Sequence, residues 1–174
     1  MDRRLFFLSL LALTPTTALA WSQAPLSLAL IPHAQRVGSA RLIVMLMPVM
    51  DVTLFSPQGH WHDDLPFALR LDYLRPLEGS GMARRATSEM RKLTNIDDHR
   101  LKLWQAQMAA IFPDVRSGDN MTALRTSDGA TLFFKDEHQI GAIYDRGFGK
   151  LFFDICLSPK TSQPTLRRQL LGEV

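Results

Sequence analysis

The sequence contains a single cysteine, Cys156, among its 174 residues. No disulfide can therefore form within the chain, which excludes the framework of small disulfide-rich secreted domains. The neighbours of this cysteine are mostly apolar. We expect it to be a small buried side chain, with a reactive thiol as the less favoured alternative.

An excess of charge of one sign is also missing. Lysine and arginine contribute 20 residues and aspartate and glutamate 17, so the formal net charge is only +3. A charge this small and this mixed argues against nucleic acid as a partner. Internal repeats, linkers and low-complexity segments are absent as well. A chain of this length forms one domain, which buries roughly 70% of its unfolded surface.

The sequence has no apolar run long enough to span a membrane, which takes about 20 residues. A shorter run near the start follows Arg3 and Arg4 and precedes the small-x-small sequence Ala18–Ala20. This order is typical of a cleaved signal peptide. We predict a signal peptide over residues 1–20, a mature domain over residues 21–174, and a periplasmic location.

The first half of the mature chain predicts strands. Apolar residues alternate over residues 26–30, which suggests an initial strand. Residues 39–55 are almost continuously apolar and are broken by Pro48, which indicates two buried strands or one bent strand. Residues 67–74 alternate clearly, as in a half-buried antiparallel strand. The residues expected on its apolar face are Phe67, Leu69, Leu71 and Tyr73.

The second half predicts helices around a three-stranded meander. Helices are expected over residues 82–93 and 98–112, the second ending before Pro113. Short strands follow over residues 121–125, 131–134 and 139–143, with an Asp-Gly hairpin turn after the first. Asp145 can cap a further helix, and a last helix covers residues 163–171. The class is α+β.

These signals form a recognisable order. Phe112 begins an FP-x-V-x-x-GD sequence, the meander leads into a glycine-rich phenylalanine helix, Leu157 begins an L-SP-K-T sequence, and Leu166 begins a closing L-R-x-x-LLG sequence. The order resembles the chalcone isomerase-like family, in the form carried by bacterial exported proteins, from about Gly38 to the C-terminus. The resemblance implies an open-faced β-sandwich, an antiparallel sheet covered on one face by helices.

The resemblance also implies where an isomerase would act. Plant chalcone isomerases use an arginine and a threonine from the first long strands, and a tyrosine and an asparagine further on. In an alignment on Pro76–Gly79, Met82 stands at the position of the tyrosine and Glu89 at that of the asparagine. In an alignment on Leu54 and Phe55, Met50 stands at the position of the threonine. Methionine cannot donate a hydrogen bond to an enolate, and glutamate would repel its charge. An isomerase that uses a cleft between the sheet and the helices is therefore the alternative to a non-catalytic protein.

An apolar cleft survives these replacements. Non-catalytic relatives of this fold bind fatty acids and pair an arginine with the carboxylate. By this resemblance we predict a protein without a cofactor that binds an apolar or acyl ligand between sheet and helices. Simple core packing is the competing interpretation for each methionine. The predicted ligand-binding residues are Arg41 for the carboxylate, Thr53 and Tyr73 as polar partners, and Met47, Met50 and Met82 in the lining.

Three further patterns have less specific interpretations. His60 and His62 alternate like metal ligands on a strand, but a third ligand at fixed spacing is missing. Methionines 45, 47 and 50 have the softness that Cu(I) prefers, although an apolar run favours core packing. The basic residues of residues 84–92 indicate a solvated helix face, with peripheral contact to anionic lipid headgroups as the alternative. An interaction protein without a small ligand is the third functional hypothesis.

Overall fold

The computed structural model of the chain describes residues 26–173. The predicted signal peptide, residues 1–20, lies outside this range. Within it, no helix is both long enough and apolar enough to cross a membrane.

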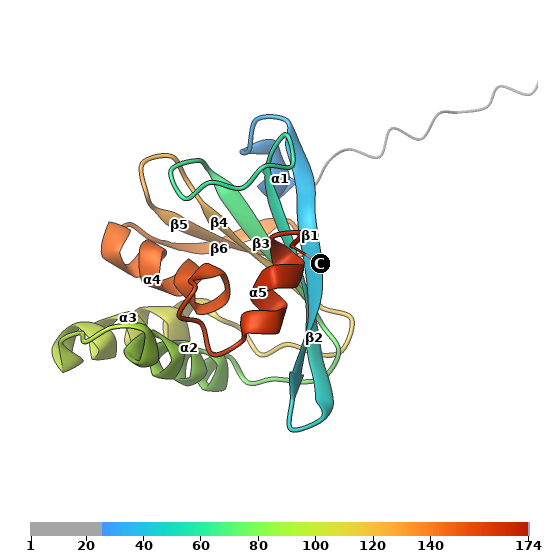
Figure 1. Cartoon of the computed structure of the whole chain (residues 1–174). Coiled ribbons are helices and arrows are strands. Elements are labelled where there is room, and N and C mark those ends of the chain that lie inside the picture. Colours follow the sequence, from blue (N-terminus) through green and yellow to red (C-terminus); the bar gives the residue numbers. More distant parts are fainter. Residues whose placement is uncertain (1–25, 174) are drawn as a thin grey trace, which may run out of the picture.

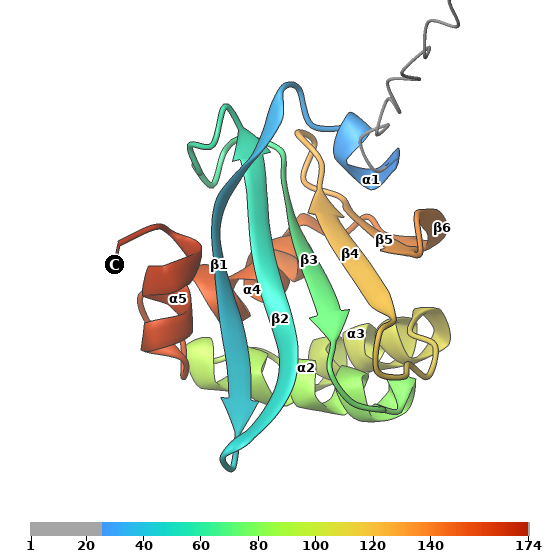
Figure 2. The same ribbon diagram turned by 90° about the vertical axis from the view of Figure 1, so that its right-hand side faces the viewer.

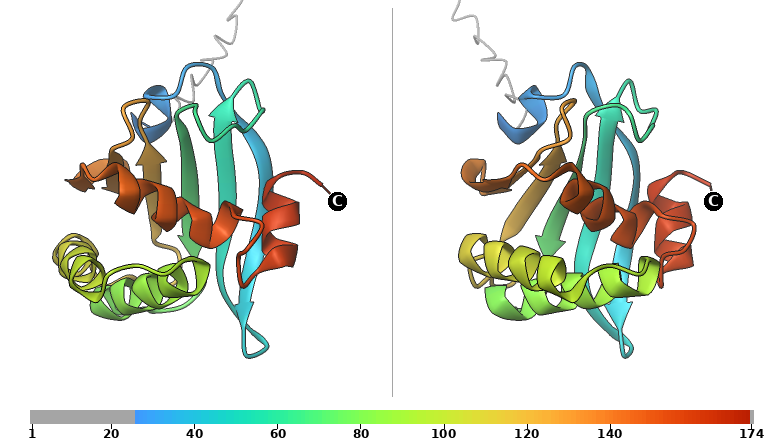
Figure 3. Two further views of the ribbon diagram at one scale, coloured as in Figure 1. Left: turned by 60° about the vertical axis from the view of Figure 1, so that its left-hand side comes forward. Right: turned by 90° about the vertical axis from the view of Figure 1, so that its left-hand side faces the viewer.

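Six antiparallel strands form one open sheet in the order β1 to β6, so each strand pairs with its neighbours in sequence. Four helices, α2 to α5, cover one face, and the short helix α1 lies at one end of the other (Figures 1, 2 and 3). This arrangement confirms the α+β class and the helix-covered antiparallel sheet. The strands are β1 (Ala34–Val44), β2 (Met47–Pro57), β3 (Phe67–Tyr73), β4 (Asn120–Arg125), β5 (Thr131–Lys135) and β6 (His138–Ile143). The helices are α1 (Leu26–Ala29), α2 (Gly79–Leu93), α3 (Asp98–Ile111), α4 (Arg146–Leu157) and α5 (Pro164–Leu170).

The strand expected over residues 26–30 is wrong, because this segment forms α1. The alternation that suggested a strand has a different cause. Leu28 and Ile31 are both buried, and they pack on the outer face of the sheet against Ala68, Leu124 and Phe134. Three residues separate the two along the chain, the spacing of one helical turn.

The apolar run over residues 39–55 forms two strands, as one of the two interpretations predicted, but neither its turn nor its burial is as expected. The chain turns at Met45 and Leu46, which both have positive φ, and not at Pro48. Pro48 pairs with Ile43 beside a register shift, where a missing N–H donor is tolerated. Because β1 is an edge strand, Ile43 remains 51% exposed.

Aromatic packing holds the helices on the sheet. Phe148 of α4 meets Trp104 of α3 at 5.6 Å between ring centroids and Phe133 of β5 at 6.3 Å. Asp145 caps α4 as predicted, accepting hydrogen bonds from the N–H groups of Gly147 and Phe148. The same carboxylate accepts a bond of 3.1 Å from the indole N–H of Trp104, so one side chain ties α3 to the start of α4.

Helix α5 approaches β1 closely at Gly38. A Cβ atom on Gly38 would lie 2.2 Å from the carbonyl oxygen of Gln169 and 2.6 Å from that of Leu170. Both obstacles are backbone atoms, so no rotamer change can make room. Glycine at this position is therefore a condition for docking the last helix.

We expect Gly38→Ala to lower the free energy of unfolding by about 2 kcal/mol, the usual cost of overpacking. Gly81→Ala is the matched control. A Cβ there meets nothing closer than 3.6 Å, and alanine raises helix propensity by up to about 1 kcal/mol. Chemical denaturation of the three proteins checks this, and equal stability of the two variants would contradict it.

Candidate functional site

A cavity of about 490 Å³ lies between the inner face of the sheet and helices α2, α4 and α5. This volume is within the range of about 300–1,000 Å³ that is typical of small-molecule sites. Its walls are mainly leucine, valine, methionine and phenylalanine side chains from β1 to β5 and these helices. Such a lining can hold a hydrocarbon chain but offers few fixed hydrogen bonds.

Four of the predicted site residues line this cavity: Met47, Met50, Tyr73 and Met82. The strand register explains two of them, because Met50 of β2 pairs with Tyr73 of β3 and both point inward. Met82 enters from α2 on the opposite wall. Their contact with a ligand stays a prediction, but the structure brings them to one cavity.

The structure does not bring Arg41 and Thr53 to the cavity. Leu42 of β1 faces inward, so its neighbour Arg41 faces outward. There Arg41 donates two hydrogen bonds, of 2.7 and 2.9 Å, to Asp51 of the paired strand. Thr53 lies on the same outer face, two residues further along β2. The closeness of Arg41 in sequence to the apolar run predicts a place in the cavity, whereas the two-residue period of the strand directs its side chain to the outer face.

Two other arginines line the cavity, Arg75 and Arg85. Arg75 follows β3 and is half-buried, with one guanidinium nitrogen 3.9 Å from the sulfur of Met47. Among residues 26–173, no carboxylate forms an ion pair with Arg75. The alternation that directs Tyr73 inward also predicts that Arg75, two residues later, points into the cavity. The sequence therefore contained a signal for the position of Arg75.

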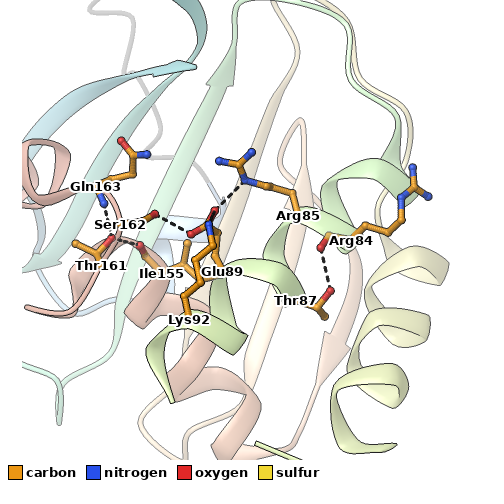
Figure 4. Close-up of polar contacts among 9 residues, drawn as sticks. All are labelled: Arg84, Arg85, Thr87, Glu89, Lys92, Ile155, Thr161, Ser162 and Gln163. Atoms are coloured by element: carbon orange, nitrogen blue, oxygen red, sulfur yellow. Dashed lines mark hydrogen bonds and ion pairs between the residues drawn. The ribbon is translucent and has the colours of Figure 1, made fainter. Parts of the chain in front are cut away.

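Among residues 26–173, Glu89 is the one carboxylate in the lining of this cavity, and it is only 7% exposed. It accepts a hydrogen bond of 2.7 Å from the hydroxyl of Ser162 and pairs with Lys92 at 2.9 Å and Arg85 at 3.0 Å (Figure 4). Ser162 belongs to the α4–α5 connection, so Glu89 joins α2 to that segment. The sequence indicates Glu89 only as the residue at the position of an isomerase asparagine. It does not indicate the bond to Ser162, because Ser162 is distant in the chain.

Glu89 is ionised despite its position. Burial opposes its charge, but the bonds from Ser162 and Lys92 and the charge of Arg85 outweigh burial and hold the pKa below its usual value. A carboxylate with a lowered pKa and three partners is a weak base. Its role in the structure is to fasten two segments together.

The remaining polar groups in the cavity wall are neutral. Burial, reinforced by the charge of Glu89, raises the pKa of the Cys156 thiol to about 12. Burial likewise raises the pKa of Tyr73, whose hydroxyl donates to the sulfur of Met121 at 3.6 Å. Neither group is an activated nucleophile at neutral pH.

Among residues 26–173, His60 and His62 belong to no cluster of potential metal ligands. The structure places both side chains on the connection between β2 and β3, which is mostly exposed. Within residues 26–173, no group of three or more histidine, cysteine, aspartate or glutamate side chains is close enough together to hold a metal ion.

Comparison with known proteins is consistent with this architecture. A family model described as chalcone isomerase-like matches residues 58–172, which is more than half of the chain. The fold is similar to the crystal structure of a fatty-acid binding protein of Arabidopsis thaliana, with a TM-score of 0.58 and 7% identity. The similarity covers 82% of this chain and 86% of the plant protein, and at this identity it shows the fold alone. A comparison with curated proteins finds no match.

We expect Glu89→Gln to lower the free energy of unfolding at neutral pH by about 1 kcal/mol, because glutamine can accept from Ser162 but carries no charge for Lys92 and Arg85. The difference should close as the pH falls below 4.5, the usual pKa of glutamate. The folded-state pKa is depressed, so the wild-type stabilisation is present above that value and is lost as the pH falls through the folded pKa.

Denaturant titrations from neutral pH to about pH 3 measure this dependence. Glu78→Gln, an exposed glutamate at the start of the same helix without a capping bond, is the control and should cost less. A deficit in Glu89→Gln that stays constant with pH would contradict the assignment.

Proposed function

This chain belongs to the chalcone isomerase-like family, and we propose that it is a non-catalytic member whose cavity binds an acyl ligand such as a fatty acid. The match of the family model confirms the resemblance that the sequence motifs indicated. The observation that carries the proposal is the apolar cavity of about 490 Å³, whose lining includes Arg75, an arginine without an ion pair to any carboxylate of residues 26–173. The similar fold of a plant fatty-acid binding protein supports it.

The energetics favour a long hydrocarbon chain. Each buried methylene contributes about 0.8 kcal/mol, so an acyl chain binds to such walls with little polar help. The methionines adapt to chains of different shape, because their side chains are unbranched and polarisable. The lining therefore favours a class of amphiphiles over one rigid molecule.

The carboxylate end needs water or a cation, because an unpaired buried charge is expensive. Arg75 offers a guanidinium beside Met47 without a carboxylate partner among the described residues. Arg85 is already engaged by Glu89 at 3.0 Å. We assign the carboxylate to Arg75, in the role that the sequence had suggested for Arg41.

The isomerase alternative finds little support in the cavity. Met82, at the position of the family's tyrosine, has no hydrogen to donate to a developing enolate. The hydroxyl of Tyr73 donates to Met121 and that of Ser162 to Glu89. Glu89 adds a negative charge to the wall, which opposes charge build-up on an enolate oxygen.

We also propose that the protein acts in the periplasm after cleavage at Ala20, because Arg3 and Arg4, a short apolar run and the sequence Ala18–Ala20 follow one another as in a signal peptide. Export would place the cavity near membrane lipids. N-terminal sequencing of the protein from the periplasmic fraction tests this, with Trp21 expected as the first residue. A soluble periplasmic chain that begins at Met1 would contradict it.

We expect Arg75→Gln to raise the Kd for a fatty acid about tenfold and to leave the Kd of the matching fatty alcohol nearly unchanged, because only the acid presents a charge. Met47→Ala should weaken both ligands alike. Calorimetric titration of the wild type and of both variants with each ligand measures the six Kd values.

Arg41→Gln is the matched control, since Arg41 lies on the outer face and should affect neither ligand. An acid-selective loss in Arg41→Gln would instead restore the assignment made from the sequence. A wild-type protein that binds neither ligand would contradict the proposal and favour an interaction protein.

We expect no ring closure of a hydroxylated chalcone above the uncatalysed rate, because the wall at Met82 and Glu89 cannot stabilise the enolate. Absorbance of the chalcone over time, with and without protein, measures this. A saturable rate that Met82→Ala or Glu89→Gln abolishes would establish the enzymatic alternative.

A further inference from the structure

The hairpin that joins β1 and β2 reaches beyond the rest of the sheet, at the bottom of the views in Figures 1 and 2. We call residues 43–47 at its end the hairpin tip. Four of its five side chains are large, apolar and exposed, and Val44 is partly buried. The exposed fractions are 51% for Ile43, 90% for Met45, 95% for Leu46 and 49% for Met47.

The backbone of the tip makes these residues unexpected. Met45 and Leu46 have φ values of 49° and 64° at the two central positions of the hairpin turn. Consecutive positive φ values in a two-residue hairpin favour Asn-Gly, and bulky residues adopt them at a cost. Asn-Gly would make the same turn with less strain and no exposed apolar surface. Formation of the fold therefore does not account for Met45 and Leu46.

The hairpin tip is also part of the cavity wall. Val44, Met45 and Met47 line the cavity, so the tip forms its rim. Arg75 lies beside Met47 at the same rim. Anything that covers the tip would therefore face the cavity directly.

The charges beside the tip indicate what covers it. Arg75, which lies beside Met47, has no ion pair with a carboxylate of residues 26–173. Arg85 lines the same cavity but is paired with Glu89 at 3.0 Å. An apolar tip with a free cation next to it is complementary to a bilayer surface, where acyl chains lie beneath anionic headgroups. The proposed ligand has the same chemistry as that surface.

We propose that the hairpin tip inserts into the surface of an anionic bilayer and opens the cavity toward the lipid, so that an acyl ligand enters without crossing water. This inference rests on the proposed function and adds the partner surface to it. The insertion is shallow, involving the side chains of a single turn, and the binding is reversible. Peripheral contact had been considered for the basic face of residues 84–92, whereas the tip supplies the apolar part of the surface.

Flotation of the purified protein with equimolar phosphatidylcholine–phosphatidylglycerol vesicles tests the proposal. We expect Leu46→Gln to weaken vesicle binding on the order of tenfold, the loss expected for removing one buried leucine. Leu103→Gln is the matched control, because Leu103 on α3 is 52% exposed and lies outside the tip. Both variants carry the same residues 1–25, so any vesicle binding by that segment is equal in the two. The difference between the variants therefore reports on the hairpin alone. Vesicles of phosphatidylcholine alone should bind the wild type more weakly.

A second measurement separates docking from the proposed function. Leu46 does not line the cavity, so Leu46→Gln should bind a soluble fatty acid in buffer as tightly as the wild type, while its uptake from vesicles slows. Loss of fatty-acid binding in every protein, with vesicle binding still dependent on Leu46, would refute the cavity function and keep the docking surface. Equal vesicle binding by Leu46→Gln and the wild type, or no vesicle binding at all, would overturn the docking proposal.

Discussion

The register of β1, β2 and β3 is the constraint on which core and cavity depend. Along these strands every second side chain meets the helices, and those between them meet the outer face. Met50 and Tyr73 pair on the inner face, and Arg41 and Asp51 pair on the outer one. A shift of one residue would exchange the two sets, bringing the arginine inside and the apolar residues into water.

The space between sheet and helices stays open because the helices are held at its margins. At one end, Phe148 packs on Trp104 and Phe133 and fills the interior. At another, Glu89 fastens α2 to the α4–α5 connection through Ser162. Between these attachments the walls are flexible methionine and leucine side chains. Such an interior adapts to its contents more readily than a fully interlocked core.

The proposed function depends on a few side chains in the cavity wall that favour binding over catalysis. An enolate needs hydrogen-bond donors in fixed positions, whereas a hydrocarbon chain needs only apolar volume. Met82 and the ionised Glu89 supply no such donor, whereas the cavity supplies the apolar volume. The same apolar surface continues outside the cavity into the hairpin at Met45 and Leu46. The proposed binding site and the exposed hairpin tip are thus parts of one apolar surface.

Local patterns in the sequence determined much of this protein. The alternation of residues 67–74, the cap at Asp145 and the turn signals of the meander predicted their elements close to the observed bounds. These features depend on neighbours within a few residues, which propensity and periodicity describe well. Only the tertiary structure decided the surroundings of Arg41 and Glu89. The face of an edge strand depends on its pairing register, and the ionised state of a buried carboxylate depends on a serine far along the chain, because both are set by contacts that sequence spacing does not encode.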